Sequence, residues 1–424
     1  MNILFVTCIF RVFGGIDCGA ANRSTMFVKS LAKIGHVDVI SFGKDSITSN
    51  INNCEVVYNQ SIPQKYVDTK IERIKGYLRL ITQPCNPNAY YVLDKQCEEV
   101  VDKQIALKKY DIIACRYIGD AIRCGLDKYP ARLVVDVDDN LVSATLRDLK
   151  TFKFKHTISK YMYLYKAHAI GWMSKTFLKK IRVSFYSNFW EPTSKKSIFL
   201  HNVTALDRQN PEIPSNSPNR LLLVGWLDFA PNKYGALHFV DKVLPKIQEI
   251  LPDVELHIVG KTKDEDLNKY LNSCKGVNAL GFVDDISNEY TNCRVIIVPV
   301  YQGAGTSVKF VEGMMMNRPM VSTPMGVRGF ETMCHPDKEY LLAKDDDEFA
   351  NQVIKLLQNA KLADNIAKNA YEVGEKYFSA KRFEDIVVNS IKKNLNYDES
   401  KIRLSNRWLR FVRSLICSFC SQAR

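Results

Sequence analysis

The feature that most constrains the fold is a regular alternation of short apolar runs, rich in β-branched residues, with longer stretches of helical periodicity. Such alternation favours parallel sheets covered by helices, because parallel strands need long connections that return over the sheet. In the first half we expect six strands, over residues 2–8, 37–42, 111–115, 132–136, 168–173 and 197–200. A helix is expected over 20–34, between the first two strands.

A segment of linker composition separates this series from a second one. Residues 203–219 hold Pro211, Pro214 and Pro218 among several Asn and Ser residues. Beyond it we expect strands over 220–224, 254–259, 294–299 and 319–322, and helices over 233–251, 264–274, 306–316 and 349–377. The sequence therefore predicts an α/β protein with two facing Rossmann-like domains and parallel sheets. Ligands of such sheets bind beyond the carboxyl ends of the strands, here in an interdomain cleft.

The predicted boundaries divide the chain into five parts. These are an N-terminal domain over 1–202, a linker over 203–219, a C-terminal domain over 220–377, a helix crossing back toward the N-terminal domain over 378–399, and a basic amphipathic tail over 400–424. The length of 424 residues suits two domains, and 46% hydrophobic with 25% charged residues is typical of a soluble protein.

Targeting signals are not evident in the sequence. No window of about 18 uncharged apolar residues appears, and the start lacks the basic region of a signal peptide. We therefore expect a cytoplasmic protein. Its twelve cysteines are scattered through apolar runs and are expected to stay reduced. The C-x-x-C pair Cys417 and Cys420 has no second pair or histidine nearby, so zinc is not expected there.

The basic charge is concentrated at the C-terminus. The chain has a net charge of +13, and residues 401–424 contain six basic residues and no acid. From Arg403 to Phe419, apolar residues recur on one helical face and arginines on the other, a pattern that favours contact with an anionic membrane surface. A helix docked on the protein body, or one that binds a partner protein, is the alternative. Nucleic-acid binding is not expected, because the folded part lacks an aromatic and basic platform.

The most informative segment is the glycine-rich loop that follows the strand expected over 294–299. Unpaired amides at the start of the next helix carry the positive end of its dipole and suit a diphosphate. Lys309 lies one turn into that helix and adds a full charge, and Glu312 follows on the same face, where it could accept hydrogen bonds from ribose hydroxyls. By itself the loop could equally be a capped helix with surface Lys and Glu. Its candidate binding residues are Gly303, Gly305, Thr306, Ser307, Lys309 and Glu312.

This run resembles the C-terminal domain of family 4 glycosyltransferases, which are retaining enzymes of the GT-B fold. The subgroup it is similar to carries Gly-x-Gly-Thr-x-x-Lys, then Glu, then Pro and Ser-Thr-Pro-x-Gly. Upstream, Leu-Val-Gly-Trp at 223–226, Val-Leu-Pro at 243–245 and Leu-Gly-Phe-Val-Asp-Asp at 280–285 follow in the order of that family. The resemblance covers about 197–335, and the N-terminal half matches only loosely.

The resemblance implies roles for several residues. Glu312 matches the second glutamate of a Glu-x7-Glu pair that contacts the ribose, while Ala304 replaces the first glutamate, so the identity of the donor sugar stays open. Trp226 stands where an arginine is common. Gly225 and Lys233 lie near the phosphate-binding positions of the first C-terminal strand. Lys309 is the expected substitute for the missing charge.

The N-terminal half contributes glycines and acids. Gly15 and Gly19 follow the first strand, and the resemblance implies a loop beside the donor phosphates, although an ordinary strand-to-helix turn also uses glycine. Asp138 closes a strand in the position where many relatives have histidine. It is a candidate catalytic residue that orients the acceptor or stabilises an oxocarbenium ion. The alternatives are a helix cap or a metal site, and no metal ion is expected.

The resemblance implies transfer of a sugar from a UDP- or GDP-sugar to a hydroxyl, with retention at the anomeric carbon and without a cofactor. Asp138 and Lys309 would be the catalytic residues. A glycan or lipid-linked acceptor of surface polysaccharide or lipopolysaccharide synthesis would suit a protein held at the inner face of the plasma membrane. A nucleotide-sugar epimerase and a non-catalytic subunit of the same fold are the alternatives, the latter because of Ala304 and Trp226. A dehydrogenase is disfavoured because no Gly-x-Gly-x-x-Gly follows the first strand.

Overall fold

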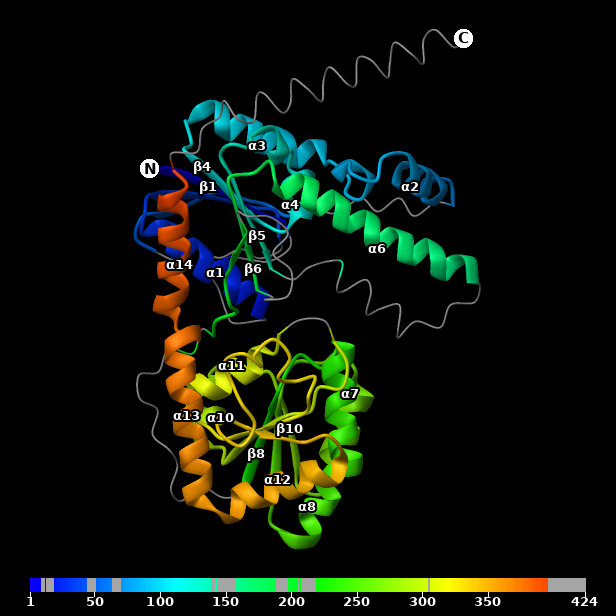
Figure 1. Ribbon diagram of the computed structural model, residues 1–424, viewed down its shortest axis with the longest axis vertical. Helices are drawn as coiled ribbons and strands as arrows, with labels where there is room; N and C mark the ends of the chain where they lie inside the picture. The colour runs from blue at the N-terminus through cyan, green and yellow to red at the C-terminus, as the bar shows by residue number, and fades with distance from the viewer. Residues whose placement is uncertain are drawn as a thin grey trace.

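The computed structural model describes residues 1–8, 12, 19–43, 51–62, 70–138, 142, 157–187, 197–204, 206, 219–303 and 306–395. These residues form two α/β domains, drawn one above the other in Figure 1, each built around one parallel sheet. The predictions for Gly15, Ala304, Gly305, most of the linker over 203–219 and the tail over 400–424 concern residues outside the described ones.

The N-terminal sheet has seven strands in the order β3-β2-β1-β4-β5-β6-β7. Its strands are β1 (Asn2–Thr7), β2 (His36–Ser41), β3 (Cys54–Asn59), β4 (Ile112–Arg116), β5 (Leu133–Asp138), β6 (Val183–Tyr186) and β7 (Ser197–Phe199). Its helices are α1 (Gly19–Ala32), α2 (Lys70–Thr82), α3 (Lys95–Leu107), α4 (Ile118–Arg123) and α6 (Thr157–Leu178), with short 3₁₀ turns over Pro87–Ala89 and Leu126–Lys128. The central strands are buried on both faces, which explains why they read as nearly continuous apolar runs.

The C-terminal sheet has six parallel strands in the order β10-β9-β8-β11-β12-β13. Its strands are β8 (Arg220–Val224), β9 (Glu255–Val259), β10 (Val277–Gly281), β11 (Val295–Val298), β12 (Met320–Ser322) and β13 (Leu341–Leu342). Its helices are α7 (Ala230–His238), α8 (Leu244–Ile250), α9 (Glu265–Ser273), α10 (Ile286–Asn292), α11 (Val308–Met315), α12 (Asp346–Gln358) and α13 (Ala360–Phe378). The prediction of two parallel α/β sheets is thus confirmed.

Some individual elements differ from the sequence predictions. The strand expected over 168–173 is wrong, because these residues lie inside the 22-residue helix α6. A six-residue apolar run suits a strand or a buried helix turn equally, and its helical neighbours on both sides decide the outcome. The edge strand β3 and the short strands β6, β10 and β13 were not predicted. The helix expected over 349–377 is two helices divided at Asn359, whose side chain caps α13 by accepting from the Leu362 amide.

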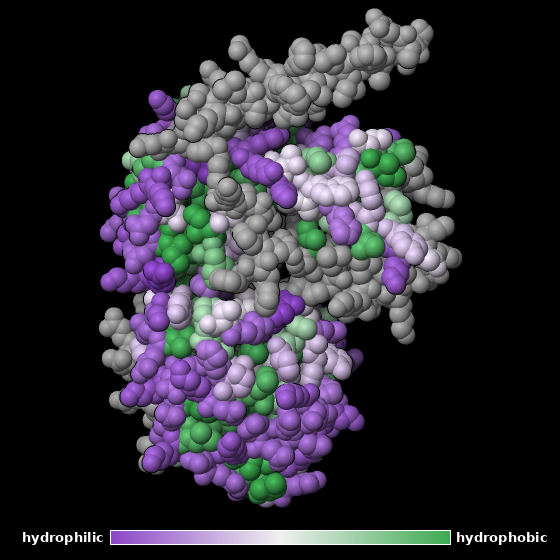
Figure 2. All heavy atoms as spheres, in the orientation of Figure 1, coloured by the Kyte–Doolittle hydropathy of each residue, from purple (hydrophilic) through white to green (hydrophobic). Residues whose placement is uncertain are grey.

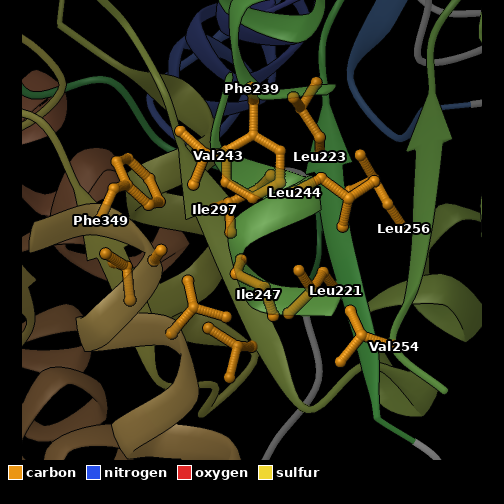
Figure 3. Packing of buried hydrophobic residues seen from close by; sticks show 14 of the residues in the cluster. Leu221, Leu223, Phe239, Val243, Leu244, Ile247, Val254, Leu256, Ile297 and Phe349 are labelled. Carbon is orange, nitrogen blue, oxygen red and sulfur yellow. The ribbon is translucent and has the colours of Figure 1, made fainter. Parts of the chain in front are cut away.

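The helix expected over 233–251 contains a π-helical turn over Phe239–Val243, which joins α7 to α8. Pro245 has no amide proton to donate to the preceding turn, and a wider turn accommodates it without ending the helix. Phe239, Val243 and Ile247 project from this segment onto the sheet residues Leu221 and Leu223, as Figure 3 shows. This packing fixes α7, and therefore the residues at its first turn, against the centre of the sheet.

The two last described helices connect the domains. α13 packs along α11 in the C-terminal domain, and α14 (Ala380–Lys393) continues beside α1 in the N-terminal domain, along one side of the molecule in Figure 1. Phe383, Val387 and Ile391 of α14 share a buried cluster with Phe27 of α1. Ser379 separates the two helices and caps α14 by accepting from the Arg382 amide. One continuous pair of helices therefore sets the distance between the two sheets.

The surface seen in Figure 2 is mainly hydrophilic over the C-terminal domain, and its hydrophobic residues form small, separate patches. Among the described residues, no helix is both long enough and apolar enough to cross a membrane.

Candidate active site at the domain junction

The loop after β11 turns sharply at Gly303. Its φ of +146° lies in a region that side chains with a Cβ rarely adopt, so glycine is required there. The same residue lies beside Pro231 in the first turn of α7. The helix α11 begins at Val308, two residues after the predicted start. Gly303 therefore lies beside the first turn of α7, and α11 begins five residues later.

The start of α11 faces the N-terminal domain. A Cβ built on Gly19, at the start of α1, would lie 3.1 Å from Cγ2 of Val308, so the two helix N-termini nearly touch. The Asn202 side-chain amide donates to Oγ1 of Thr306 over 2.9 Å. On its other side, Thr306 packs against Gly329, where a Cβ would come within 2.7 Å of the threonine methyl group. Thr306 is thus held between the domains, with the amino end of α11 beside it.

Lys309 lies in the first turn of α11, partly buried. Its Nζ donates to Oδ1 of Asn232 over 2.8 Å, and it forms no ion pair with a carboxylate among the described residues. Desolvation lowers the pKa of Lys309 to about 8, although the nearby Glu312 acts in the opposite direction. A lysine that carries its charge at this cost, without a counter-ion, is suited to an anionic ligand.

The helix start next to this lysine also has unused hydrogen-bonding groups. Ser307 occupies the N-cap position but makes no capping hydrogen bond, and its buried hydroxyl has no partner among the described residues. A desolvated ammonium group and an unpaired hydroxyl at the start of a helix together form an arrangement that suits an anion.

Glu312 lies one turn further along α11 and is 9% exposed. The Tyr290 hydroxyl donates to its Oε2 over 2.5 Å, and this tyrosine comes from α10. Burial raises the pKa of Glu312 above its usual value, while Tyr290 and Lys309 oppose that shift. Tyr290 therefore fixes one carboxylate oxygen, and the ribose contact of Glu312 stays a prediction.

Gly225 and Lys233 take different positions around α7. A Cβ on Gly225 would lie 2.7 Å from Nδ2 of Asn232, so glycine allows the first turn of α7 to approach β8. Lys233 points to the side of the site, where its Nζ forms an ion pair with Asp264 over 2.6 Å. Its charge is thus compensated, in contrast to that of Lys309. The residue that sequence reasoning missed is Asn232, which orients Lys309.

In the N-terminal domain, three buried charged side chains and one partly buried one form what we call the arginine–aspartate cluster: Arg23, Arg116, Asp136 and the partly buried Asp138. Arg23 binds Asp136 in a bidentate manner, with two hydrogen bonds of 2.8 Å. Nε of Arg116 lies 3.2 Å from the same carboxylate, and its Nη2 donates to Asp138. Two positive and two negative charges make the cluster electrically neutral.

Asp138, the candidate catalytic acid, is the last residue of β5 and has a φ of +62°. Non-glycine residues adopt this conformation only where their surroundings enforce it. Burial by itself raises the pKa of Asp138, but Arg116 and Arg23 outweigh this effect and hold the pKa below its usual value. The carboxylate is therefore ionised at neutral pH and is not poised to accept a proton.

The cluster extends to the glycine-rich loop through Arg23. Its Nη1 donates over 3.0 Å to the carbonyl oxygens of Leu200 and His201 and to Oδ1 of Asn202. Asn202 in turn donates to Thr306, so a continuous hydrogen-bonded path joins Asp136 to the start of α11. Sequence reasoning missed this path. The available signal was an arginine directly after the buried run of β4, next to acids at the end of β5.

Comparison with known families gives a match for one segment. Residues 218–359 match the sequence profile of a family described as "Glycosyl transferases group 1". The matched segment contains β8 to β12, the glycine-rich loop, Lys309 and Glu312. The chain therefore carries a glycosyl transferases group 1 domain.

One relative is similar in sequence. An uncharacterized 44.6 kDa protein in the cps region of Klebsiella pneumoniae is 30% identical over 175 residues, which are 39% of this chain and 44% of that protein. The match thus spans less than half the length of that relative.

Solved structures resemble almost the whole chain. Sucrose-phosphate synthase from Thermosynechococcus elongatus superimposes with a TM-score of 0.64 at 15% identity, covering 92% of this chain and 98% of that one. Anabaena HepE in complex with UDP and glucose gives 0.61 at 14% identity, covering 92% and 99%. WaaG, a glycosyltransferase involved in lipopolysaccharide biosynthesis, gives 0.56 at 15% identity, covering 91% and 99%. The two domains together therefore have the GT-B fold.

The residues of the candidate site therefore divide into those inside the matched segment and those outside it. Lys309, Asn232 and Glu312 lie within the group 1 domain. The arginine–aspartate cluster lies outside the matched residues, in the half of the chain where only the fold is shared with known structures.

Proposed function

We propose that this protein is a retaining glycosyltransferase that moves a sugar from a UDP- or GDP-sugar to a hydroxyl of a glycan or lipid-linked acceptor. The observation that carries the proposal is Lys309, a desolvated cation in the first turn of α11 that forms no ion pair with a carboxylate among the described residues. The group 1 domain and the UDP-bound structural neighbour support a nucleotide-sugar donor. No metal ion or other cofactor is part of the proposal.

In the proposed reaction, the bond between the anomeric carbon and the diphosphate breaks, and negative charge accumulates on the leaving diphosphate. Lys309 and the amides at Thr306 and Ser307 stabilise that charge, and this preorganised electrostatic effect is the main contribution to catalysis. The acceptor hydroxyl forms the new bond to the anomeric carbon on the same face of the sugar, and its proton passes to the oxygen of the leaving diphosphate. Asn232 holds the ammonium group in position before the donor arrives.

Asp138 has an electrostatic role in this proposal. Because Arg116 and Arg23 keep it ionised, it favours positive charge at the anomeric carbon or orients the acceptor, and it does not remove the acceptor proton. Gly19 keeps the starts of α1 and α11 close together, and Gly303 and Glu312 shape the donor site. Closure of the domains around the donor would exclude water and suppress hydrolysis.

The biological setting belongs to the proposal as well. The structural neighbour WaaG is involved in lipopolysaccharide biosynthesis, and a basic amphipathic stretch from Arg403 to Phe419 suits an enzyme that works on lipid-linked substrates. We infer a role in surface polysaccharide or lipopolysaccharide synthesis at the inner face of the plasma membrane.

The decisive experiment combines donor screening with one matched pair of variants. UDP, GDP and their sugars are first ranked by the increase that each causes in the melting temperature. Turnover with the best donor is then measured for Lys309→Ala and for Lys246→Ala. Lys246 is a control on the far helix α8, where it pairs with Asp347.

We expect Lys309→Ala to lower turnover by at least about tenfold, the smaller end of the effect of losing one electrostatic stabiliser, and Lys246→Ala to leave turnover unchanged. Normal turnover of Lys309→Ala would refute the assigned role. Release of an altered free nucleotide sugar without acceptor, seen by NMR, would indicate an epimerase. Absence of turnover with every donor would indicate a non-catalytic subunit.

A further inference from the structure

The amino ends of β2 and β3 bring three potential metal ligands to one face of the N-terminal sheet. His36 and Asp38 are two residues apart on β2, so their side chains point to the same face. Asp38 is paired in register with Glu55 of β3, which places the glutamate on that face as well. This group is at the opposite end of the strands from Asp138 and the domain junction.

The ligand atoms are close enough to share one ion. Nε2 of His36 lies 3.0 Å from Oδ1 of Asp38 and 3.9 Å from Oε2 of Glu55. One atom from each of the three residues lies within 4.8 Å of the others. Bonds of about 2.0–2.2 Å in tetrahedral geometry separate ligand atoms by about 3.4 Å. Glu55 is 68% exposed, so its side chain has the freedom to make the small adjustment.

Asp38 supplies an independent observation. It is 2% exposed, and its Oδ2 accepts hydrogen bonds from the Tyr110 hydroxyl over 2.5 Å and from Nζ of Lys108 over 2.8 Å. Its buried Oδ1, which faces His36, accepts no hydrogen bond among the described residues. A buried carboxylate oxygen that accepts no hydrogen bond is costly. Tyr110 and Lys108 hold the carboxylate in the orientation that presents this oxygen, as outer-shell groups do in metal sites.

We propose that His36, Asp38 and Glu55 bind a divalent transition-metal ion such as Zn²⁺. One imidazole nitrogen and two carboxylate oxygens favour such an ion over Mg²⁺ or Ca²⁺, which prefer ligand sets made only of oxygen. The local charge also favours a cation, because the two carboxylates carry more negative charge than the single positive charge of Lys108 compensates. Among the described residues, β3 is an edge strand, and its one neighbour in the sheet is β2. An ion bound by both strands therefore fastens this edge to the sheet, independently of any transferase activity.

The test is a calorimetric titration of the metal-free, full-length protein with Zn²⁺. Thiols are rival ligands, so the titration is repeated with the double variant Cys417→Ser/Cys420→Ser, which removes the C-x-x-C pair. His335→Ala is a matched control, since this exposed histidine lies 3.5 Å from Glu339 but is not part of a three-ligand group. Both controls should retain the tight site.

His36→Ala and Glu55→Gln should each weaken the tight site by at least about tenfold, the lower end of the effect of losing a group that supports a metal site. Zn²⁺ should also raise the melting temperature of the parent protein and not of these variants. Equal Zn²⁺ affinity in both variants, or no stoichiometric binding by the parent protein, would overturn the proposal. Glu55 is mostly exposed, so Glu55→Gln decides the question if His36→Ala does not fold.

Discussion

At the end of the N-terminal sheet, two buried arginines face two aspartates, whereas at the start of α11 one lysine faces only the amide oxygen of Asn232. In the first set, the arginine–aspartate cluster, each charge is compensated by an opposite charge within the protein. Arg23 by itself donates five hydrogen bonds. The second is incomplete, because Lys309 forms no ion pair among the described residues and the nearby Glu312 offsets only part of its desolvation. The difference separates charges that organise the structure from a charge that is available to a ligand.

The largest expected effect comes from removing one charge of the arginine–aspartate cluster. Asp136→Asn removes the carboxylate that both arginines share and leaves a net positive charge in a fully buried place. We expect the free energy of unfolding to fall by about 3–5 kcal/mol, as for other buried ion pairs that lose one partner. Urea unfolding followed by circular dichroism measures this, with Asp347→Asn on the surface as control. A loss within 0.5 kcal/mol, roughly that of a surface substitution, would show that the cluster is not a structural unit.

Removal of the charge of Lys309 should instead affect ligand binding. Lys309→Met keeps the length of the side chain but removes its charge. Affinity for UDP or GDP should fall by about 10- to 100-fold, because a hydrogen bond to a charged group contributes about 1.5–3 kcal/mol. Isothermal titration calorimetry of the variant and of Lys246→Met makes the comparison. Equal affinities in these two variants would contradict the diphosphate site.

The same lysine predicts a dependence on pH with a definite sign. The pKa of Lys309 is about 8, below its ordinary value of 10.5, because burial disfavours the charged form. Nucleotide affinity should therefore decline as the pH rises through about 8. Without ligand, the unfolded chain binds more protons between pH 8 and 10.5, so this residue makes the protein more stable as the pH rises through that range.

Removal of the charge should then be harmless to the protein without ligand. Lys309→Met should leave the free energy of unfolding at pH 7 unchanged or raise it by on the order of 1 kcal/mol, after allowance for partial exposure. Thermal unfolding in the absence of nucleotide measures this effect. A marked loss of stability would mean that Lys309 belongs with the structural charges of the first region.

The smallest effect is expected where the two regions meet. Asn202→Ala removes the hydrogen bonds to Arg23 and Thr306 but leaves both charge sets intact. Each of these two hydrogen bonds is expected to contribute about 0.5–1.5 kcal/mol. We therefore expect a modest fall in kcat with little change in KM for the donor. Asn272→Ala, which alters hydrogen bonds within the C-terminal domain, is the control. A change confined to KM would place Asn202 in donor binding instead of positioning.

The candidate site was predictable where its chemistry lies within one short segment. Gly303, Thr306, Lys309 and Glu312 occur within ten residues, and the strand before them and the helix after them follow from local pattern. Asn232 could not be assigned to Lys309 in the same way, because 77 residues separate them. Tyr290 was likewise not assigned to Glu312, because the contact depends on how α10 packs against α11.

The arginine–aspartate cluster was less accessible still. Its members come from α1, β4 and β5, and Arg23 lies 113 residues before Asp136. The wrong prediction of a strand over 168–173 also reflects a dependence on residues outside the segment. Its apolar residues fit a strand or a helix until the neighbouring helical turns are considered.

The sequence by itself determined the two parallel α/β sheets and the need for glycine at position 303, because hydrophobic periodicity and backbone conformation act over a few residues at a time. The tertiary structure alone decided which charges are paired with opposite charges and which described lysine, Lys309, is desolvated without an ion pair. That outcome depends on distances and desolvation between side chains far apart in the chain, and these exist only after the sheets, α13 and α14 have brought the two domains together.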